Sequence, residues 1–294
     1  MEIINDAQVE PRRLRVMLQL VSDMDAPTRE AVSHLAQLPV LLENPSSKSA
    51  LSASENIHRI AVNCGLISEN DDNTLSLHVD PEHVATMLSF QDHMRQVLMG
   101  ITEASQSNYL FNLFSAWYAV QNEHVLHKLV YEGYDVAFNK EMSAYVSTAK
   151  ERLFNTTKLN GWRKWAEFLG LGWIMALGPR SILVPDATRR VKVVLPEIFL
   201  DQETLSFSLF MERLAALCPE LDGGQLFLYC WSISRGAESR SNRLSLMLST
   251  ALRTLATLNT ITLMNEADSS NVWTLYPAEG SPYKQVTHIR RQGA

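Results

Sequence analysis

The stretch 243–276 changes its hydrophobic period from that of a helix to that of a strand, and this change is the strongest constraint on the fold. Between residues 244 and 258, leucines and alanine recur every three to four positions, the spacing of a helix buried along one face. Residues 261–263 and 273–275 then alternate apolar side chains with threonine, on either side of a segment rich in Asn, Asp and Ser that favours a turn. A helix followed by a two-stranded hairpin is the second half of a winged helix, a module that usually binds another molecule.

The same order of elements is predicted near the N-terminus. Three helices and two strands, which together make a complete winged helix, are expected over 12–24, 26–38, 54–64, 66–68 and 75–79. Pro27 and Thr28 stand near the start of the second helix, where the fixed φ of proline is tolerated. Residues 1–90 hold 6 basic and 13 acidic side chains, and the turn between the strands carries Glu69, Asp71 and Asp72. This module is therefore expected to repel DNA and to bind protein.

A third helix and hairpin are predicted in the middle of the chain. A helix over 155–172 would bury Trp162 and Trp165, and two strands, 173–177 and 181–184, follow it around the turn 178–180. The predicted fold is mainly α with small β-hairpins (α+β), as tandem winged-helix modules joined by a helical connector. The expected domains are an N-terminal winged helix at 1–80, the helical connector at 81–150, a central winged helix at 151–196 and a C-terminal winged helix at 197–294.

Properties of the whole chain argue against several classes of protein. No run approaches roughly 18 apolar residues, and charged side chains are frequent in the first twenty positions. Neither a membrane span nor a signal peptide is expected, and the predicted location is cytoplasmic. Cys64, Cys218 and Cys230 are an odd number at wide spacing, which fits neither a disulfide framework nor a paired zinc site. They are expected to be buried, reduced thiols.

The residues that could be chemical form no complete catalytic or metal-binding set. His124 and His127 have the i, i+3 spacing at which two imidazoles can share a metal, but no recognised third ligand accompanies them. Pro185 and Asp186 resemble the start of a nuclease magnesium site, yet Arg190 stands where that pattern needs an acid, which favours a turn followed by a basic strand. The GxxxxGK[ST] and GxSxG motifs are absent from the sequence. The sequence therefore predicts no enzyme, no metal and no cofactor.

What remains is recognition of double-stranded DNA. Residues 151–200 hold 8 basic and 4 acidic side chains in a chain whose net charge is −6, so the central module is the best candidate to meet phosphate. In a winged helix the third helix can enter the major groove, while the wing and helix amino ends contact phosphate. The predicted DNA-binding residues lie on or beside the central and C-terminal helices and the central wing: Thr156, Thr157, Lys158, Arg163, Lys164, Arg180, Arg189, Arg190, Asn242, Arg243, Ser245, Ser249 and Arg253.

Four stretches of the sequence resemble a known family. They are FNTTKLNGWRKWAEFLGLG (154–172), LDGGQLF (221–227), ALRTLATLNTITLMNEADSSNVWTLYP (251–277) and VTHIRR (286–291), and they resemble DpdG, the G component of bacterial Dpd systems. The likeness covers roughly the last half of the chain, with a looser match in the first helices. It implies a place in a gene cluster that inserts 7-deazaguanine derivatives into bacterial DNA and restricts DNA lacking them, with this component on the restriction side. A 7-deazaguanine alters guanine N7, an acceptor in the major groove that a recognition helix could read.

Three functions are consistent with these observations. The favoured one is a non-catalytic DNA-binding and assembly subunit of a modification-dependent, anti-phage restriction complex, whose partners are DNA and other proteins of the complex. The second is a protein-interaction scaffold without direct DNA contact, because the acidic N-terminal module could dock a basic partner. The third is a winged-helix transcription regulator, which would bind a palindromic site as a dimer. A steep fall of DNA affinity with salt would separate the first function from the second.

Overall fold

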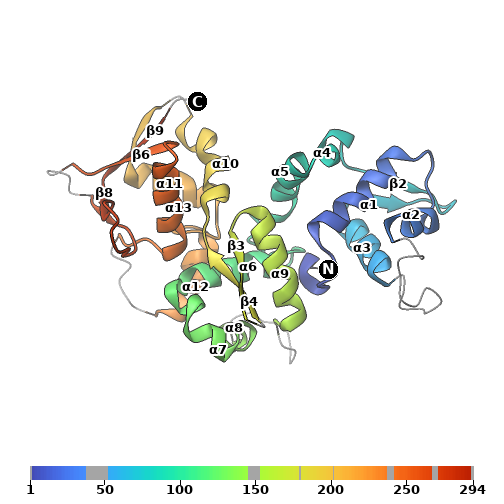
Figure 1. Ribbon diagram of the computed structural model, residues 1–294, viewed down its shortest axis with the longest axis horizontal. Coiled ribbons are helices and arrows are strands. Elements are labelled where there is room, and N and C mark those ends of the chain that lie inside the picture. The colour runs from blue at the N-terminus through green and yellow to red at the C-terminus, as the bar shows by residue number, and fades with distance from the viewer. Residues whose placement is uncertain are drawn as a thin grey trace. The chain divides into compact units, whose positions relative to one another are not determined.

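The computed structural model describes residues 2–37, 52–144, 153–178, 180–200, 202–236, 242–266 and 271–292. The chain forms two compact units, and Figure 1 shows the elements of each. Unit 1 comprises Met1–Met99 and Thr156–Phe168, and unit 2 comprises Gly100–Asn155 and Leu169–Ala294. Helices dominate both units, and the paired strands are antiparallel. These features confirm the mainly α, α+β class, whereas the winged-helix assignment and the four expected domains stay predictions.

Unit 1 begins with three helices and a hairpin in the predicted order. The elements are η1 (Ile3–Asn5), α1 (Pro11–Asp23), α2 (Arg29–Ala36), α3 (Ser52–Asn63), β1 (Ile67–Glu69) and β2 (Leu75–Leu77). Strand β1 pairs with β2, with Ile67 opposite Leu77, and an isolated bridge joins Thr28 to Thr74. The predicted elements are confirmed, although residue 38, the expected end of the second helix, lies outside the described residues.

Local sequence explains where these helices begin. Pro11 lies in the first turn of α1, where its missing amide hydrogen leaves no helical hydrogen bond unmade. The Thr28 hydroxyl accepts a hydrogen bond from the Ala31 amide at 3.2 Å and so caps α2. One face of α1 is buried at helical spacing by Leu14, Met17, Leu18 and Val21.

Helix α9 (Thr156–Leu169) comes from a distant part of the chain and completes unit 1, together with α4 (Pro81–Ala85) and α5 (Met87–Leu98). The indole of Trp165 is buried and donates its Nε1 hydrogen to the carbonyl of Val9 at 2.9 Å. A Cβ atom added at Gly161 would lie 2.9 Å from the carbonyl oxygen of Ile4, so only glycine lets the two backbones approach this closely.

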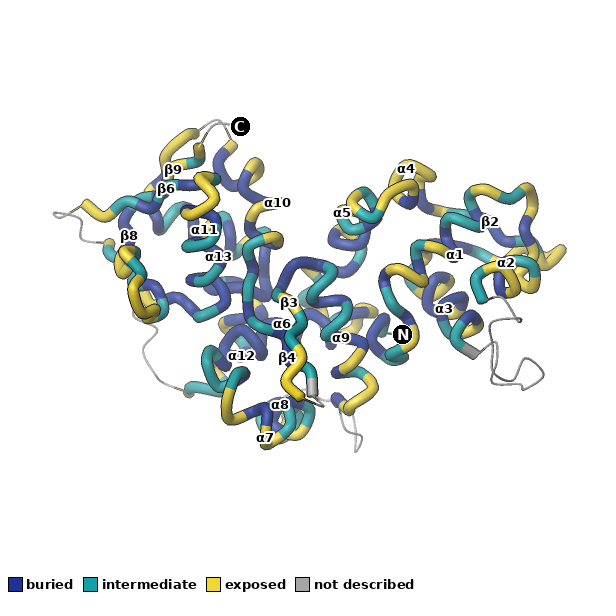
Figure 2. The backbone as a smooth tube through the Cα atoms, viewed as in Figure 1, coloured by how far each residue is buried: buried dark blue, intermediate teal, exposed yellow. Residues whose placement is uncertain are grey.

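Unit 2 is built around a buried helix, α6 (Tyr109–Val120). All of its residues except Tyr109 are buried, and Figure 2 colours buried backbone dark blue. Rings of Phe114, Trp117, Phe138 and Phe154 form an aromatic cluster, in which Phe114 and Phe154 stack at 4.0 Å. The other helices are η3 (Asn122–Leu126), α7 (Lys128–Glu132), α8 (Tyr134–Met142), α10 (Thr188–Phe199), α11 (Phe207–Leu217), α12 (Gln225–Ser234) and α13 (Leu246–Thr257). The helical character predicted for 81–150 is thus confirmed in its described residues.

The sheets of unit 2 confirm one predicted hairpin and correct another. Strands β3 (Gly172–Leu177) and β4 (Arg180–Pro185) pair as predicted. In contrast, β6 (Ile261–Met264) does not pair with β7 (Trp273–Thr274), so the hairpin predicted there is wrong. The sheet order is instead β5 (Thr204–Ser206), β9 (His288–Arg291), β6, while β7 pairs with β8 (Gln285–Val286). The physical reason is burial: Ile289 is fully buried opposite Leu205 and Leu263, and it completes the apolar face that a shorter hairpin would leave open.

The basic strand predicted after Asp186 is also wrong, because residues 188–199 form helix α10. A carboxylate oxygen of Asp186 accepts a hydrogen bond from the Thr188 amide at 2.9 Å, which satisfies a free donor at the helix start. The helix then buries Val191, Val194, Leu195 and Ile198 against the core. None of the helices in the described part of the chain has the length and apolar character needed to cross a bilayer.

Candidate nucleic-acid interface and a cationic pocket

The amino end of α9 presents the predicted polar residues of the central module to solvent. Thr156 and Thr157 are exposed, and Lys158 and Arg163 are half-buried. Arg163 donates a hydrogen bond to the side-chain oxygen of Asn160 at 3.3 Å. Hydroxyl groups, positive charges and a helix amino end are therefore present together on unit 1, and each of these favours contact with an anion.

Lys164 has a structural role that the sequence did not reveal. Its ammonium group lies 2.6 Å from the Glu10 carboxylate and 2.9 Å from the Ala7 carbonyl oxygen. Both charged side chains are about one-third exposed, at 37% and 33%. Lys164 therefore ties α9 to the segment before α1, and its charge is already balanced.

On α10, the two neighbouring arginines have opposite surroundings. Arg189 is exposed, whereas Arg190 is 5% exposed and forms an ion pair with Glu220 at 2.8 Å. Burial alone would lower the pKa of Arg190, but the Glu220 carboxylate outweighs it and raises that pKa. The exposure expected for Arg190 is wrong, because its guanidinium is sealed in the core. Arg180 lies at the start of β4, and its side chain is outside the described part of the structure.

Ser245 and Ser249 are buried and serve the fold of unit 2, so the exposure expected for them is also wrong. The Ser245 hydroxyl caps α13 by accepting from the Leu248 amide and donates to the buried carboxylate of Asp222 at 2.6 Å. The Ser249 hydroxyl accepts a hydrogen bond from the Tyr276 amide at 2.7 Å. These serines hold the start of α13 against its neighbours.

Arg253 is half-buried, and its guanidinium donates hydrogen bonds to two backbone carbonyls and one hydroxyl. It donates to the carbonyl oxygens of Tyr276 and Tyr283 at 2.7 and 3.0 Å and to the Ser281 hydroxyl at 2.9 Å. Burial lowers the pKa of its guanidinium. Arg253 therefore fixes the loop after β7 instead of projecting freely toward a ligand.

Asn242 and Arg243 are exposed just before α13, as expected. Asn242 has a φ of 40°, a left-handed conformation that asparagine tolerates better than most residues. Its carbonyl accepts from the Thr274 amide at 2.8 Å, and the Leu244 amide donates to the Thr274 carbonyl at 2.9 Å. The backbone of Arg243 is thereby held at the rim of a pocket.

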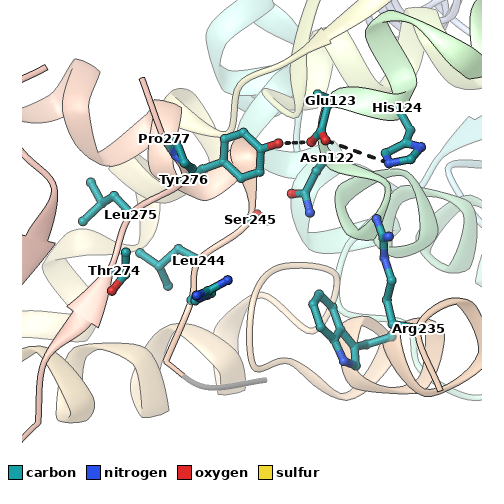
Figure 3. A pocket seen from close by; sticks show the side chains of 12 residues that line it. Asn122, Glu123, His124, Arg235, Leu244, Ser245, Thr274, Leu275, Tyr276 and Pro277 are labelled. Carbon is teal, nitrogen blue, oxygen red and sulfur yellow. Dashed lines mark hydrogen bonds and ion pairs between the residues drawn. The ribbon is translucent and has the colours of Figure 1, made fainter. Parts of the chain in front are cut away.

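This cationic pocket has a volume of about 450 Å³. It lies in unit 2 among η3, the end of α12, the start of α13 and the segment after β7, and Figure 3 shows its side chains. The lining residues are Asn122, Glu123, His124, Trp231, Arg235, Arg243, Leu244, Ser245, Thr274, Leu275, Tyr276 and Pro277. Sequence reasoning found Arg243 and Ser245 but missed the pocket, because its walls come from four separate stretches of chain.

The charged side chains of the pocket differ in the hydrogen bonds that they make. The Tyr276 hydroxyl donates to the Glu123 carboxylate, whose other oxygen lies 3.9 Å from Nε2 of His124 (Figure 3). Arg235 makes a long hydrogen bond of 3.4 Å to the Val120 carbonyl oxygen. Among the described lining residues, two arginines accompany one carboxylate, so these side chains carry an excess of positive charge in a chain that is acidic as a whole.

The three cysteines and the histidine pair His124 and His127 lie in different parts of the chain. Cys218 and Cys230 are buried, and burial raises the pKa of both thiols, whereas Cys64 is half-buried. His124 lies in the 3₁₀ helix η3 and His127 at its end. Within the described ranges, no group of three or more His, Cys, Asp or Glu side chains is placed to hold a metal ion.

Comparison with protein families gives a match that extends over most of the chain. The sequence model of the family described as DpdG-like matches residues 1–269. The chain belongs to the DpdG-like family. This membership agrees with the resemblance seen in the sequence and associates the chain with the Dpd system. Comparisons with curated proteins and with solved structures found no match.

The LDGGQLF stretch that carries part of the DpdG resemblance has a structural explanation. Asp222 accepts from Ser245, and Gly223 has a φ of 86°. A Cβ atom at Gly224 would clash with the backbone of Pro219, whose carbonyl accepts from the first residues of α12. The motif therefore shapes the turn that leads into α12 and toward the cationic pocket.

Proposed function

We propose that this chain is a non-catalytic DNA-binding and assembly subunit of a Dpd restriction complex, built from winged-helix modules. Family membership carries the proposal, because the match spans residues 1–269 and so covers unit 1 and most of unit 2. The other proteins of the complex would supply its catalytic activities and would be its protein partners.

The amino end of α9 supports the DNA contact. Its exposed threonines can donate hydrogen bonds to phosphate, and Lys158 and Arg163 add positive charge beside them. The helix amino end itself favours an anion, because its first amide groups have no partner within the helix. Lys164 is left out of this surface, since its charge is paired with Glu10.

The decisive experiment measures binding of a short duplex across a salt series for the wild type and for a Lys158→Glu/Arg163→Glu variant. Each phosphate contact contributes a log–log salt slope of about −0.9, so loss of two contacts should flatten the slope by about 2. Lys164 is kept in both proteins, because reversing its charge would set two carboxylates against each other and weaken unit 1.

The matched control is Arg12→Glu/Arg13→Glu, which makes the same change of charge at exposed positions of α1 in the same unit. It should leave the slope near that of the wild type. An equal loss in both variants would mean that only the net charge matters, and the proposed interface on α9 would then be wrong.

A role in restriction also requires that modified and unmodified DNA be told apart by the assembled complex. If this chain makes the distinction, the purified protein should bind duplexes with guanine and with a 7-deazaguanine derivative unequally, because the major-groove edge differs at N7. Equal affinity for the two duplexes would assign the discrimination to another subunit.

A scaffold without DNA contact is the second candidate, and the hairpin of unit 1 favours it. Glu69, Asp71 and Asp72 are exposed at the tip, and hydrogen bonds from Thr74 lower the pKa of Asp72, which keeps its carboxyl charged. Neutralising Glu69 and Asp71 as Glu69→Gln/Asp71→Asn should weaken copurification with the other Dpd proteins if this tip docks a basic partner. Asp72 is retained because it caps the turn through Thr74.

A further inference from the structure

The cationic pocket of unit 2 has the size of a small-molecule site. Its volume of about 450 Å³ falls within the usual range of roughly 300–1,000 Å³ for ligand pockets, and a DNA duplex would not fit inside it. The pocket therefore calls for a ligand other than the duplex proposed for α9.

The walls of the pocket are held in place independently of any ligand. Asn122, with a φ of 53°, accepts the Leu246 amide on its side-chain oxygen at 2.8 Å, which fixes η3 against the start of α13. The Tyr276–Glu123 hydrogen bond joins the segment after β7 to η3 (Figure 3). Preformed walls lower the entropic cost of binding.

The charges of the pocket select an anion. Arg235 and Arg243 supply two positive charges, and Glu123, the one acid among the described lining residues, accepts a hydrogen bond from the Tyr276 hydroxyl. Arginine offers a planar fork of donors that matches phosphate oxygens.

The rest of the lining suits a flat ring. Trp231 is half-buried, and its indole lines the pocket beside Arg235. Leu244 and Leu275 supply apolar surface, while Thr274 and Asn122 offer polar groups that can orient a base. Aromatic side chains stack on nucleobases with little dependence on the base.

We propose that the cationic pocket binds one nucleotide, with its phosphate between Arg235 and Arg243 and its base against Trp231. The nucleotide is either free in solution or part of a single strand, since both present the same phosphate and ring. This site lies in unit 2 and does not depend on duplex contact by α9 in unit 1, so each proposal can fail without the other.

The test measures binding of thymidine monophosphate by calorimetry to the full-length protein, beside thymidine and inorganic phosphate as probes of the two halves of the ligand. The monophosphate should bind at least about tenfold more tightly than thymidine or inorganic phosphate, because thymidine lacks the phosphate contacts and phosphate lacks the base contacts. Arg243→Ala should weaken its binding by about 10- to 100-fold, and Arg243→Lys should recover only part, since the ammonium lacks the planar fork.

Lys192→Ala is the matched control, because it removes one exposed positive charge from α10 in the same unit but outside the pocket. It should leave the affinity for the monophosphate unchanged, and unchanged melting temperatures should show that all variants are folded. No binding of the monophosphate, or equal effects of Arg243→Ala and Lys192→Ala, would overturn the proposal. Phosphate binding as tightly as the monophosphate would overturn recognition of the base.

A competition experiment identifies the source of the nucleotide. Displacement of the monophosphate by a short 5′-phosphorylated oligothymidylate, sensitive to Arg243→Ala, is expected if the pocket takes a nucleotide within a strand. Binding of the monophosphate without displacement by the strand also supports the site, and assigns it to a free nucleotide.

Discussion

Removal of Arg190 should destabilise unit 2 strongly, although the residue looks from the sequence like a surface cation. Its guanidinium is 5% exposed, lies 2.8 Å from Glu220 and also donates to the Leu217 carbonyl at 2.7 Å. Arg190→Met would leave the Glu220 carboxylate, which is 0% exposed, charged and without its partner in the core. Loss of one member of a buried ion pair destabilises by about 3–5 kcal/mol, and we expect a loss of that size.

Urea denaturation followed by circular dichroism measures this loss. A second variant, Arg190→Met/Glu220→Gln, removes both charges and should recover most of the stability, because no unpaired charge remains in the core. Lys192→Met on the exposed side of the same helix should change the free energy of unfolding by no more than about 0.5 kcal/mol. A loss below about 1 kcal/mol for Arg190→Met, the range of an exposed pair, would refute the reasoning.

Three further outcomes follow from burial and close packing. Burial and the charge of Arg29 lower the pKa of His58 below its usual 6.5. As the pH falls, His58 is therefore protonated in the unfolded chain before it is protonated in the folded protein. The stability of unit 1, fully present above pH about 6.5, should therefore fall as the pH drops below it, and His58→Gln should flatten that fall in urea titrations at several pH values. Gly161→Ala should destabilise unit 1 by about 1–3 kcal/mol, because its Cβ would meet the Ile4 carbonyl, and a thermal melt unchanged from the wild type would contradict this contact. Alkylation of the folded protein at mildly alkaline pH should modify Cys64 only, because the thiols of Cys218 and Cys230 are buried. Mass spectrometry of the alkylated protein measures this, and labelling of Cys218 or Cys230 would contradict their burial.

Elements of the fold that depend on neighbouring residues could be predicted from the sequence. The hairpin of unit 1 is specified by the apolar positions at Ile67, Leu75 and Leu77 and by the polar turn between them. The pairing of β6 with β9 could not be predicted, because it joins residues separated by more than twenty positions. A local pattern favours the nearest strand, whereas the buried Ile289 decides the actual partner.

The candidate site shows the same division between local and distant information. The exposure of Thr156 and Thr157 follows from their place at a helix start, which the sequence indicates. The burial of Arg190 had a signal that was missed: on a helix it precedes the buried Val194 by four residues and Ile198 by eight, so all three share a face. Nothing local could reveal that Lys164 meets Glu10, because that ion pair joins parts of the chain 154 residues apart.

The chain passes between its two compact units three times, after Met99, after Asn155 and after Phe168. Deletion mapping would therefore mislead. A fragment that stops at residue 99 has every element of unit 1 except α9, and it loses the Trp165 hydrogen bond and the Lys164 ion pair that anchor the residues before α1. If such a fragment lost an activity, the loss could come either from the incomplete unit 1 or from the missing unit 2, and the experiment would not distinguish them. Point substitutions in the intact chain are the sound way to assign functions to its surfaces.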